Sequence, residues 1–228
     1  MYNLEGVKWF TRIVKSLAGK KVCELGSQQI WEHAKPHLDT THDFARDWMI
    51  DEGVEEYISV DLNGEGGSIR ADLSTEQMWG SIFEHFDIVT NIGTSEHVIG
   101  WPPGSRDSIL ESQMMCFANM FFLCEEGGLI INQLPNDELW KDHALLHYSP
   151  AFPHALARAF ESPLIACEKV QLATLNQKAS LLMFAIQKSG IAVVPEIGRI
   201  AREIVVASDE RLKEANSQDH WWPKGKRR

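Results

Sequence analysis

The hydrophobic positions of this sequence follow two spacings, one typical of helices and one typical of buried strands. Between positions 4 and 17 they recur every three or four residues, which predicts an amphipathic helix that ends near Gly19. A second helix should begin at Thr40 or Thr41, whose hydroxyl groups suit a helix start, and stop around Gly53. Further helices are expected at 108–124, at 152–160 and beyond Pro195.

Seven short apolar runs alternate with these helices. They lie at 21–26, 57–61, 68–71, 86–91, 129–134, 165–172 and 180–187. Alternating strands and helices predict an α/β fold, a doubly wound and mostly parallel seven-stranded sheet with helices on both faces. Residues 173–179 are too few for a helical crossover, so the last two strands should form a C-terminal antiparallel hairpin.

Length and composition agree with one folded domain. The chain has 228 residues, of which 44% are hydrophobic, and no apolar run approaches the roughly 20 residues of a membrane span. We therefore expect a soluble, cytoplasmic single domain over 1–228, with an N-terminal helix at 1–19 and a core at 20–190. A C-terminal helix and a basic tail should fill 191–228. The four cysteines form no CxxC pair and are predicted to be free thiols.

The charge of the chain restricts its partners. There are 32 acidic and 22 basic side chains, so the overall field repels a phosphate backbone and disfavours a nucleic-acid substrate. The basic residues at 224–228 are predicted to be a solvated end rather than a nucleic-acid arm. The Trp221-Trp222 pair before them is predicted to dock on the domain or on a second subunit, which leaves a homodimer or a heteromeric partner open.

Polar residues and a glycine follow the first four predicted strands, where open parallel sheets bind their ligands. Gly26 ends the first strand and allows a sharp turn. Asp61 ends the second strand, where a carboxylate can accept both hydroxyl groups of a ribose. Asp72 follows the third strand, where a carboxylate can accept a purine amino group, and Asn91 follows the fourth. In this order along the chain, the four positions predict a nucleoside pocket.

At these positions the sequence resembles the class I S-adenosylmethionine-dependent methyltransferases, which have a Rossmann-like fold. Glu24-Leu-Gly26 resembles the start of the first motif of that family, and Tyr57-Ile-Ser-Val-Asp61 resembles the second. Phe86-Asp-Ile-Val-Thr-Asn-Ile-Gly-Thr-Ser-Glu-His-Val98 is similar to the segment of the fourth strand and is the most specific match. The resemblance runs from about Lys20 to Gln187 and implies S-adenosylmethionine as the cofactor.

The resemblance also implies which residues contact the cofactor. They are Glu24, Gly26, Ser27, Asp61, Leu62, Asp72, Leu73, Asn91, Ile92 and Gly93. The sequence departs from the family pattern directly after Gly26, where Ser27, Gln28 and Gln29 replace further glycines. These side chains should narrow the space in which the methionine end of the cofactor lies. The insertion Trp31 to Asp51 is expected near the mouth of the site.

Three residues are candidates for the acceptor side of the site. A histidine near the acceptor can remove a proton where the acceptor carries one. His97 matches the Glu-His pair of the family, although a structural role at the strand end competes with catalysis. His147 and Tyr148 follow the fifth strand and are equal candidates to line the acceptor pocket. Trp101, in the loop 100–104, is predicted either to stack on the acceptor or to anchor the loop.

We therefore predict methyl transfer to a small-molecule or other modest polar acceptor. Two alternatives remain, a non-catalytic binding or scaffold subunit with the same fold, and a nucleotide-dependent oxidoreductase. The second alternative is disfavoured because neither GxGxxG nor a P-loop motif occurs. The His143-x-x-x-His147 and His33-x-x-x-His37 pairs have the spacing of metal ligands, but neither carries the HExxH glutamate, and no metal site is predicted.

Overall fold

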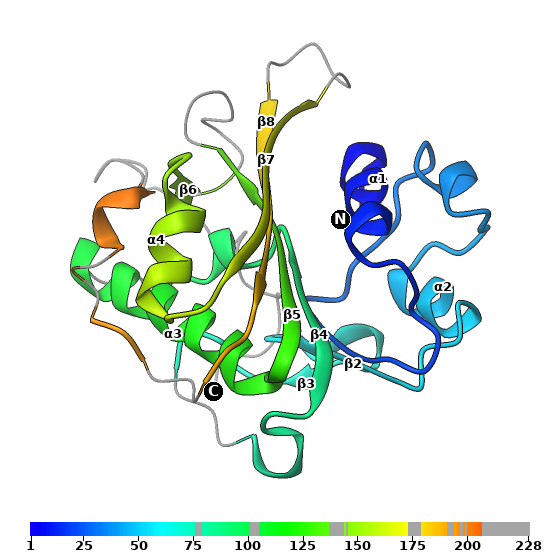
Figure 1. Ribbon diagram of the computed structural model, residues 1–228, viewed down its shortest axis with the longest axis horizontal. Helices are drawn as coiled ribbons and strands as arrows, with labels where there is room; N and C mark the ends of the chain where they lie inside the picture. The colour runs from blue at the N-terminus through cyan, green and yellow to red at the C-terminus, as the bar shows by residue number, and fades with distance from the viewer. Residues whose placement is uncertain are drawn as a thin grey trace.

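A single seven-stranded sheet organises the chain (Figure 1). The computed structural model describes residues 1–75, 79–100, 105–136, 144, 146–172, 179–190, 194–196, 198 and 200–206. Its strands are β1 (Lys21–Leu25), β2 (Glu56–Asp61), β3 (Ile69–Arg70), β4 (Phe86–Ile92), β5 (Cys124–Pro135), β7 (Leu164–Leu172) and β8 (Ala179–Gln187). Their order across the sheet is β3-β2-β1-β4-β5-β8-β7, as expected for a doubly wound fold.

The strand directions confirm the predicted hairpin. Neighbouring strands from β3 to β5 are parallel, whereas β8 runs antiparallel to both β5 and β7. The parallel strands therefore all end at one edge of the sheet, which we call the rim. The residues that follow β1, β2, β3 and β4 meet there, and ligands of such sheets bind at this edge.

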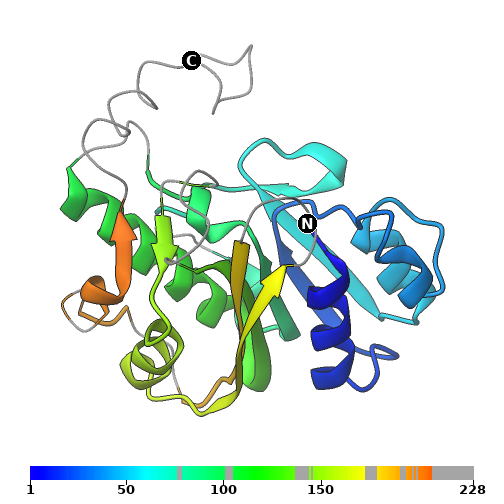
Figure 2. The ribbon, with the colours of Figure 1, turned by 90° about the horizontal axis from the view of Figure 1, so that it is seen from above.

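Helices cover both faces of the sheet (Figures 1 and 2). The helices α1 (Leu4–Ile13) and α2 (Ala45–Asp51) lie on one face, and α3 (Arg106–Leu123) and α4 (Phe152–Ala159) lie on the other. Alternate residues of each strand point to opposite faces. Thus Val22 and Ile88 pack with α1 and α2, while Cys23 and Val89 pack with α3.

The predicted helix starts and ends were partly wrong. α1 stops at Ile13 rather than near Gly19, because the backbone of Val14 is extended; Leu17 is still buried. α2 begins at Ala45, because the preceding Asp43 and Phe44 pair with the segment that follows β1. Neither Thr40 nor Thr41 therefore lies at a helix start.

The end of the described chain also corrects the prediction. Between Pro195 and Val206 the described residues form a short 3₁₀ turn, η6 (Ala201–Glu203), that leads into strand β9 (Ile204–Val206), and the rest of the segment predicted as a C-terminal helix and basic tail, 207–228, lies outside the described residues. β9 pairs antiparallel with β6 (Leu146–Tyr148), a strand that the sequence pattern did not reveal. The other 3₁₀ turns are η1 (Lys35–His37), η2 (Glu65–Gly67), η3 (Gly80–Ile82) and η4 (Ser95–His97). The Trp221-Trp222 pair, the basic tail and the segments 76–78 and 101–104 lie outside the described residues.

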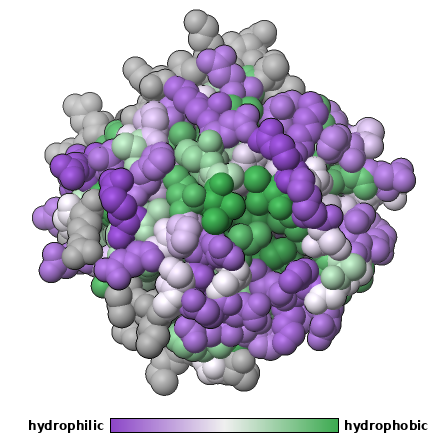
Figure 3. All heavy atoms as spheres, viewed as in Figure 1, coloured by the Kyte–Doolittle hydropathy of each residue, from purple (hydrophilic) through white to green (hydrophobic). Residues whose placement is uncertain are grey.

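The surface carries one feature that the sequence did not indicate. Figure 3 shows hydrophobic side chains gathered at the centre of the face viewed in Figure 1, between α1 and the β7–β8 hairpin. Half-buried hydrophobic residues of these elements include Leu4, Ile13, Ala166 and Val170. No helix within the described ranges is both long and apolar enough to span a bilayer. All four cysteines are free, and Cys167 on the edge strand β7 is exposed.

Candidate functional site

The ends of β1 and β2 are joined through one carboxylate. Gly26 turns the chain with φ of 78°, a conformation that favours glycine, and its N–H donates to Val60 O over 2.7 Å. Asp61 Oδ2 accepts from Ser27 N and Asp61 Oδ1 from Asn63 N, each over 3.2 Å. A carboxylate has about four acceptor positions, so Asp61 can still accept hydroxyl groups. The structure thus brings Gly26, Ser27 and Asp61 together at the rim, as predicted.

The segment after β3 forms the next part of the rim. Asp72 Oδ1 accepts from Ser74 N over 2.9 Å and from Ser74 Oγ over 2.6 Å, so this carboxylate closes a turn of its own. Leu73 is buried, whereas Leu62 after β2 is exposed. Asp72 therefore has a structural role that the sequence argument did not assign, and one of its oxygens is committed to it.

The segment after β4 is held by a chain of buried polar side chains. Asn91 Oδ1 accepts from Ser95 N over 3.0 Å, and Asn91 Nδ2 donates to Ser95 Oγ over 2.9 Å and to Asn132 Oδ1 over 3.0 Å. Gly93 turns with φ of 74° and donates to Gln133 O over 2.9 Å. Asn91 is thus a structural anchor of the rim, while Ile92 and Gly93 contribute backbone.

The space above Gly26 is filled by side chains. Gln28 is buried, and its Nε2 donates to Leu25 O over 3.1 Å and to Thr94 Oγ1 over 2.8 Å. A Cβ placed on Gly26 would lie 2.6 Å from both Gln28 Nε2 and Thr94 Oγ1. The narrowing expected from the replaced glycines is therefore caused chiefly by Gln28.

The amino group of Met1 lies beside this glutamine. It donates to Gln28 Oε1 over 2.5 Å and to Ile92 O over 3.0 Å. Burial lowers the pKa of this amino group, and the carboxylates of Glu96 and Glu24 oppose that effect. Acceptor groups beside the ends of β1 and β4 therefore hold an amine in this structure.

Glu24 lies under the rim with its side chain fully buried. Its Oε2 accepts from Tyr57 OH over 2.5 Å and from Gln28 N over 3.2 Å, whereas its Oε1 has no hydrogen-bond donor. Burial raises the pKa of the carboxyl to about 7, although these donors favour its charged form. The Tyr2 hydroxyl lies beside both the Glu24 carboxyl and Thr90, so these three fully buried side chains form one polar cluster under the rim.

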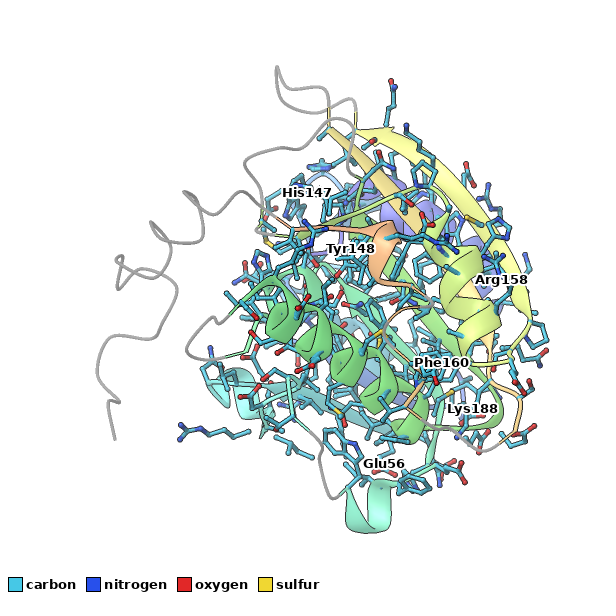
Figure 4. The ribbon with its side chains drawn as sticks, turned by 90° about the vertical axis from the view of Figure 1, so that its left-hand side faces the viewer. Glu56, His147, Tyr148, Arg158, Phe160 and Lys188 are labelled. Carbon is cyan, nitrogen blue, oxygen red and sulfur yellow. The ribbon has the colours of Figure 1, made fainter. Side chains whose placement is uncertain are left out.

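The three predicted acceptor-side residues occupy different environments. His97 is exposed at the end of η4, and His147 is buried on β6. Tyr148 is fully buried, and its hydroxyl contacts Ser95 Oγ at 3.0 Å and donates to Gln113 Oε1 over 2.7 Å. Figure 4 shows His147 and Tyr148 near the rim end of the sheet, with Glu56 and Lys188 near the opposite end. Trp101 and His143 lie outside the described residues.

The described residues form no group of side chains suited to bind a metal ion. No cluster of three or more histidine, cysteine, aspartate or glutamate side chains within these ranges is arranged to hold an ion. The histidines of the insertion make other contacts instead. The ring of His33 packs edge-on against the ring of Trp31, with 5.2 Å between their centroids. His42 Nε2 lies 2.7 Å from Asp51 Oδ2. The insertion packs beside α1 through its 3₁₀ turn η1, and a bridge between Tyr2 and Ile30 joins the residues that precede α1 and the insertion.

The comparisons with solved structures identify the fold. The N1-methyltransferase of 1,6-didemethyltoxoflavin from Burkholderia thailandensis, solved with S-adenosylhomocysteine, aligns over 81% of this chain and 76% of its own, with a TM-score of 0.52 and 13% identity. A second match is the N-methyltransferase NodS from Bradyrhizobium japonicum, over 82% and 96% of the two chains, with a TM-score of 0.51 and 12% identity. The chain has the fold of the class I methyltransferases.

A third methyltransferase fold shows the same agreement. The S-adenosylmethionine-dependent methyltransferase from Mesorhizobium loti matches over 82% of this chain and 100% of its own, with a TM-score of 0.52 and 10% identity. No family model and no curated protein sequence matches the chain. The shared methyltransferase fold places the carboxyl ends of β1, β2 and β4 side by side, which is the arrangement that the resemblance implied.

Proposed function

We propose that this protein binds S-adenosylmethionine at the rim and transfers its methyl group to a small-molecule or other modest polar acceptor. One observation carries the proposal. Gly26 and Asp61 lie at the ends of adjacent strands in a methyltransferase fold, where Gly26 N donates to Val60 O and the Asp61 carboxylate accepts from Ser27 N. Glu24, Ser27, Asp61 and the Ile92–Gly93 backbone would hold the cofactor, with Leu62, Asp72, Leu73 and Asn91 around its nucleoside end.

The residues present fit such a cofactor at its nucleoside end. Asp61 retains acceptor positions for ribose hydroxyl groups, and Ile92 O already accepts from an amine, a group that the methionine end of the cofactor also carries. Bound S-adenosylmethionine supplies a methyl group on a positively charged sulfur, so the protein need only hold the acceptor close to it. Of the acceptor-side residues, the exposed His97 is the better candidate to accept a proton, whereas Tyr148 supports the loop from within.

Calorimetry with S-adenosylhomocysteine tests the proposal. Asp61→Ala should weaken binding roughly ten- to hundredfold, because hydrogen bonds to a charged group contribute about 1.5–3 kcal/mol. Asp87→Ala is the control, since Asp87 likewise accepts two hydrogen bonds, from the Lys20 ammonium and from Lys21 N, but lies at the opposite end of the sheet. It should leave binding unchanged. Absence of binding to the wild type at millimolar ligand would reject the proposed function, and equal binding by Asp61→Ala would reject the role of Asp61.

Gln28→Ala should bind S-adenosylhomocysteine roughly a hundredfold more tightly than the wild type. Binding of the methionine end requires the carboxamide to leave its contacts with Leu25 O, Thr94 and Met1, and each such hydrogen bond is worth about 1 kcal/mol net. Gln29→Ala is the control because the neighbouring Gln29 side chain is exposed. The same calorimetric titration measures both variants, and unchanged affinity for Gln28→Ala would show that the carboxamide is no obstacle.

The filled space above Gly26 also favours one alternative function. A non-catalytic binding or scaffold subunit needs no open cofactor site, and Gln28, Thr94 and the Met1 amino group close this one. If neither the wild type nor Gln28→Ala binds S-adenosylhomocysteine, this alternative replaces methyl transfer. Whether the protein forms a homodimer or a heteromeric complex stays a prediction.

A further inference from the structure

Helix α3 carries two amide side chains whose residues are fully buried, Gln113 and Asn119. Most other buried positions of this helix are apolar, among them Phe117, Met120 and Phe121. An amide in the interior must find partners for its two N–H donors and its oxygen, because an unpaired one costs about 1–3 kcal/mol. The partners of these two amides therefore show what the helix holds in place.

Gln113 holds the segment that follows β4. Its Nε2 donates to Ser95 O over 2.6 Å and to Val98 O over 2.5 Å, which are carbonyl groups at the start of η4 and just beyond its end. Its Oε1 accepts from Tyr148 OH over 2.7 Å. Both N–H groups and the oxygen are thus satisfied, and none of them is available to a ligand.

Asn119 holds the segment that follows β3 in the same manner. Its Nδ2 donates to Leu73 O over 3.2 Å and to Thr75 O over 2.9 Å. Its Oδ1 accepts from Trp79 Nε1 over 3.2 Å. Each amide therefore gives two hydrogen bonds to one rim segment and receives one from an aromatic side chain.

The two amides lie six positions apart on one helix, which corresponds to about 9 Å along its axis. We propose that Gln113 and Asn119 are positioning residues that set the spacing between the two rim segments, 72–75 and 93–98, and so shape the two ends of the ligand site. The assignment of these ends to a cofactor rests on the proposed function. The coupling of α3 to the two segments rests only on the contacts above.

Amide hydrogen exchange tests the positioning role without any ligand. The near-isosteric changes Gln113→Met and Asn119→Leu remove the hydrogen bonds and keep most of the volume. Gln113→Met should speed exchange about tenfold at Val98 N, which donates to Ser95 O, and leave Thr75 N unchanged. Asn119→Leu should speed exchange about tenfold at Thr75 N, which donates to Asp72 O, and leave Val98 N unchanged. Equal acceleration in both segments, or in neither, would overturn the proposal.

Ligand fragments test the link to the site. 5′-Methylthioadenosine lacks the amino-acid end of S-adenosylhomocysteine and reports on the nucleoside end alone. Asn119→Leu should weaken both ligands about tenfold, whereas Gln113→Met should weaken S-adenosylhomocysteine about tenfold and leave methylthioadenosine unchanged. A merely structural defect would weaken both ligands equally in both variants. If the wild type binds neither ligand, the proposed function fails, and the exchange measurement still decides the positioning role.

Milder variants keep the test decisive if either amide change prevents folding. Tyr148→Phe removes the hydroxyl that donates to Gln113 Oε1 and contacts Ser95 Oγ, and Trp79→Phe removes the indole N–H that donates to Asn119 Oδ1 together with part of the ring. Each should reproduce a weaker form of the corresponding local change. Met120→Leu, a volume-conserving change at a fully buried position of the same helix, should alter neither segment. A Met120→Leu variant that accelerates exchange in both segments would overturn the assignment to the two amides.

Discussion

At pH 8, Glu24→Gln should be more stable than the wild type by roughly 3 kcal/mol. The carboxyl of Glu24 is fully buried, and burial raises its pKa from 4.5 to about 7. Each pKa unit corresponds to about 1.4 kcal/mol, so ionising this group inside the folded protein costs roughly 3 kcal/mol. A neutral amide of similar shape avoids that cost.

The pH dependence of this effect has a definite sign. Between pH 4.5 and about 7 the folded wild type retains the Glu24 proton while the unfolded chain loses it. The free energy of unfolding of the wild type should therefore fall as pH rises through this window and level off above it. Urea unfolding at pH 5 and pH 8 measures the difference, which should be small at pH 5 and near its full value at pH 8.

Several groups face Glu24 and must be separated from it. The Tyr57 hydroxyl and Gln28 N donate to it, and Tyr2 and the Met1 amino group lie near enough to influence it electrostatically. Burial lowers the pKa of the Met1 amino group, so its titration has the opposite sign. Tyr57→Phe is the control: it removes a donor that favours the carboxylate, so the decline with pH should extend above pH 7. If the free energy of unfolding changes with pH equally in the wild type and in Glu24→Gln, the carboxyl of Glu24 does not have the raised pKa.

The sheet could be predicted from the sequence because most of its strands contain a short apolar run that is followed by a turn residue. The seven predicted runs correspond to β1, β2, β3, β4, β5, β7 and β8, and the short loop after Leu172 correctly indicated the antiparallel hairpin. Helix ends were less predictable, since they depend on tertiary contacts. The extended segment before Ala45 pairs with the chain after β1, and no local pattern shows such a bridge.

The rim could be predicted only in part. Gly26 and Asp61 follow strands that are adjacent in the sheet, so the order of polar residues along the chain was enough to bring them together. Gln113 and Asn119 gave one visible signal, two amides in a helix whose other buried residues are mostly apolar, but their partners lie 15 to 46 positions away in sequence. Strand β6 was missed because three residues give too short a pattern, although it places Tyr148 against Ser95.

Glu84→Ala should destabilise the protein by about 3 kcal/mol, although the change lies far from the rim. Lys188 follows β8 with its side chain fully buried, and its Nζ donates to Glu84 Oε1 over 2.6 Å and to Cys124 O over 2.7 Å. Removing the carboxylate leaves a buried ammonium without its counter-charge, a defect that costs about 3–5 kcal/mol in proteins. The partial exposure of Glu84 admits some water and places the expected loss at the low end of that range.

A double-mutant cycle isolates this ion pair. Lys188→Met keeps an apolar side chain of similar length and removes the buried charge, so the double variant with Glu84→Ala should be more stable than Glu84→Ala alone. Urea unfolding of the four proteins gives the coupling energy, and additive losses would show that the pair contributes nothing beyond its separate side chains.

Because Lys188 joins the starts of β4 and β5, at the end of the sheet opposite Tyr148 (Figure 4), S-adenosylhomocysteine affinity of the folded variants should match the wild type. If a folded variant bound S-adenosylhomocysteine more weakly than the wild type, the far end of the sheet would influence ligand binding at the rim.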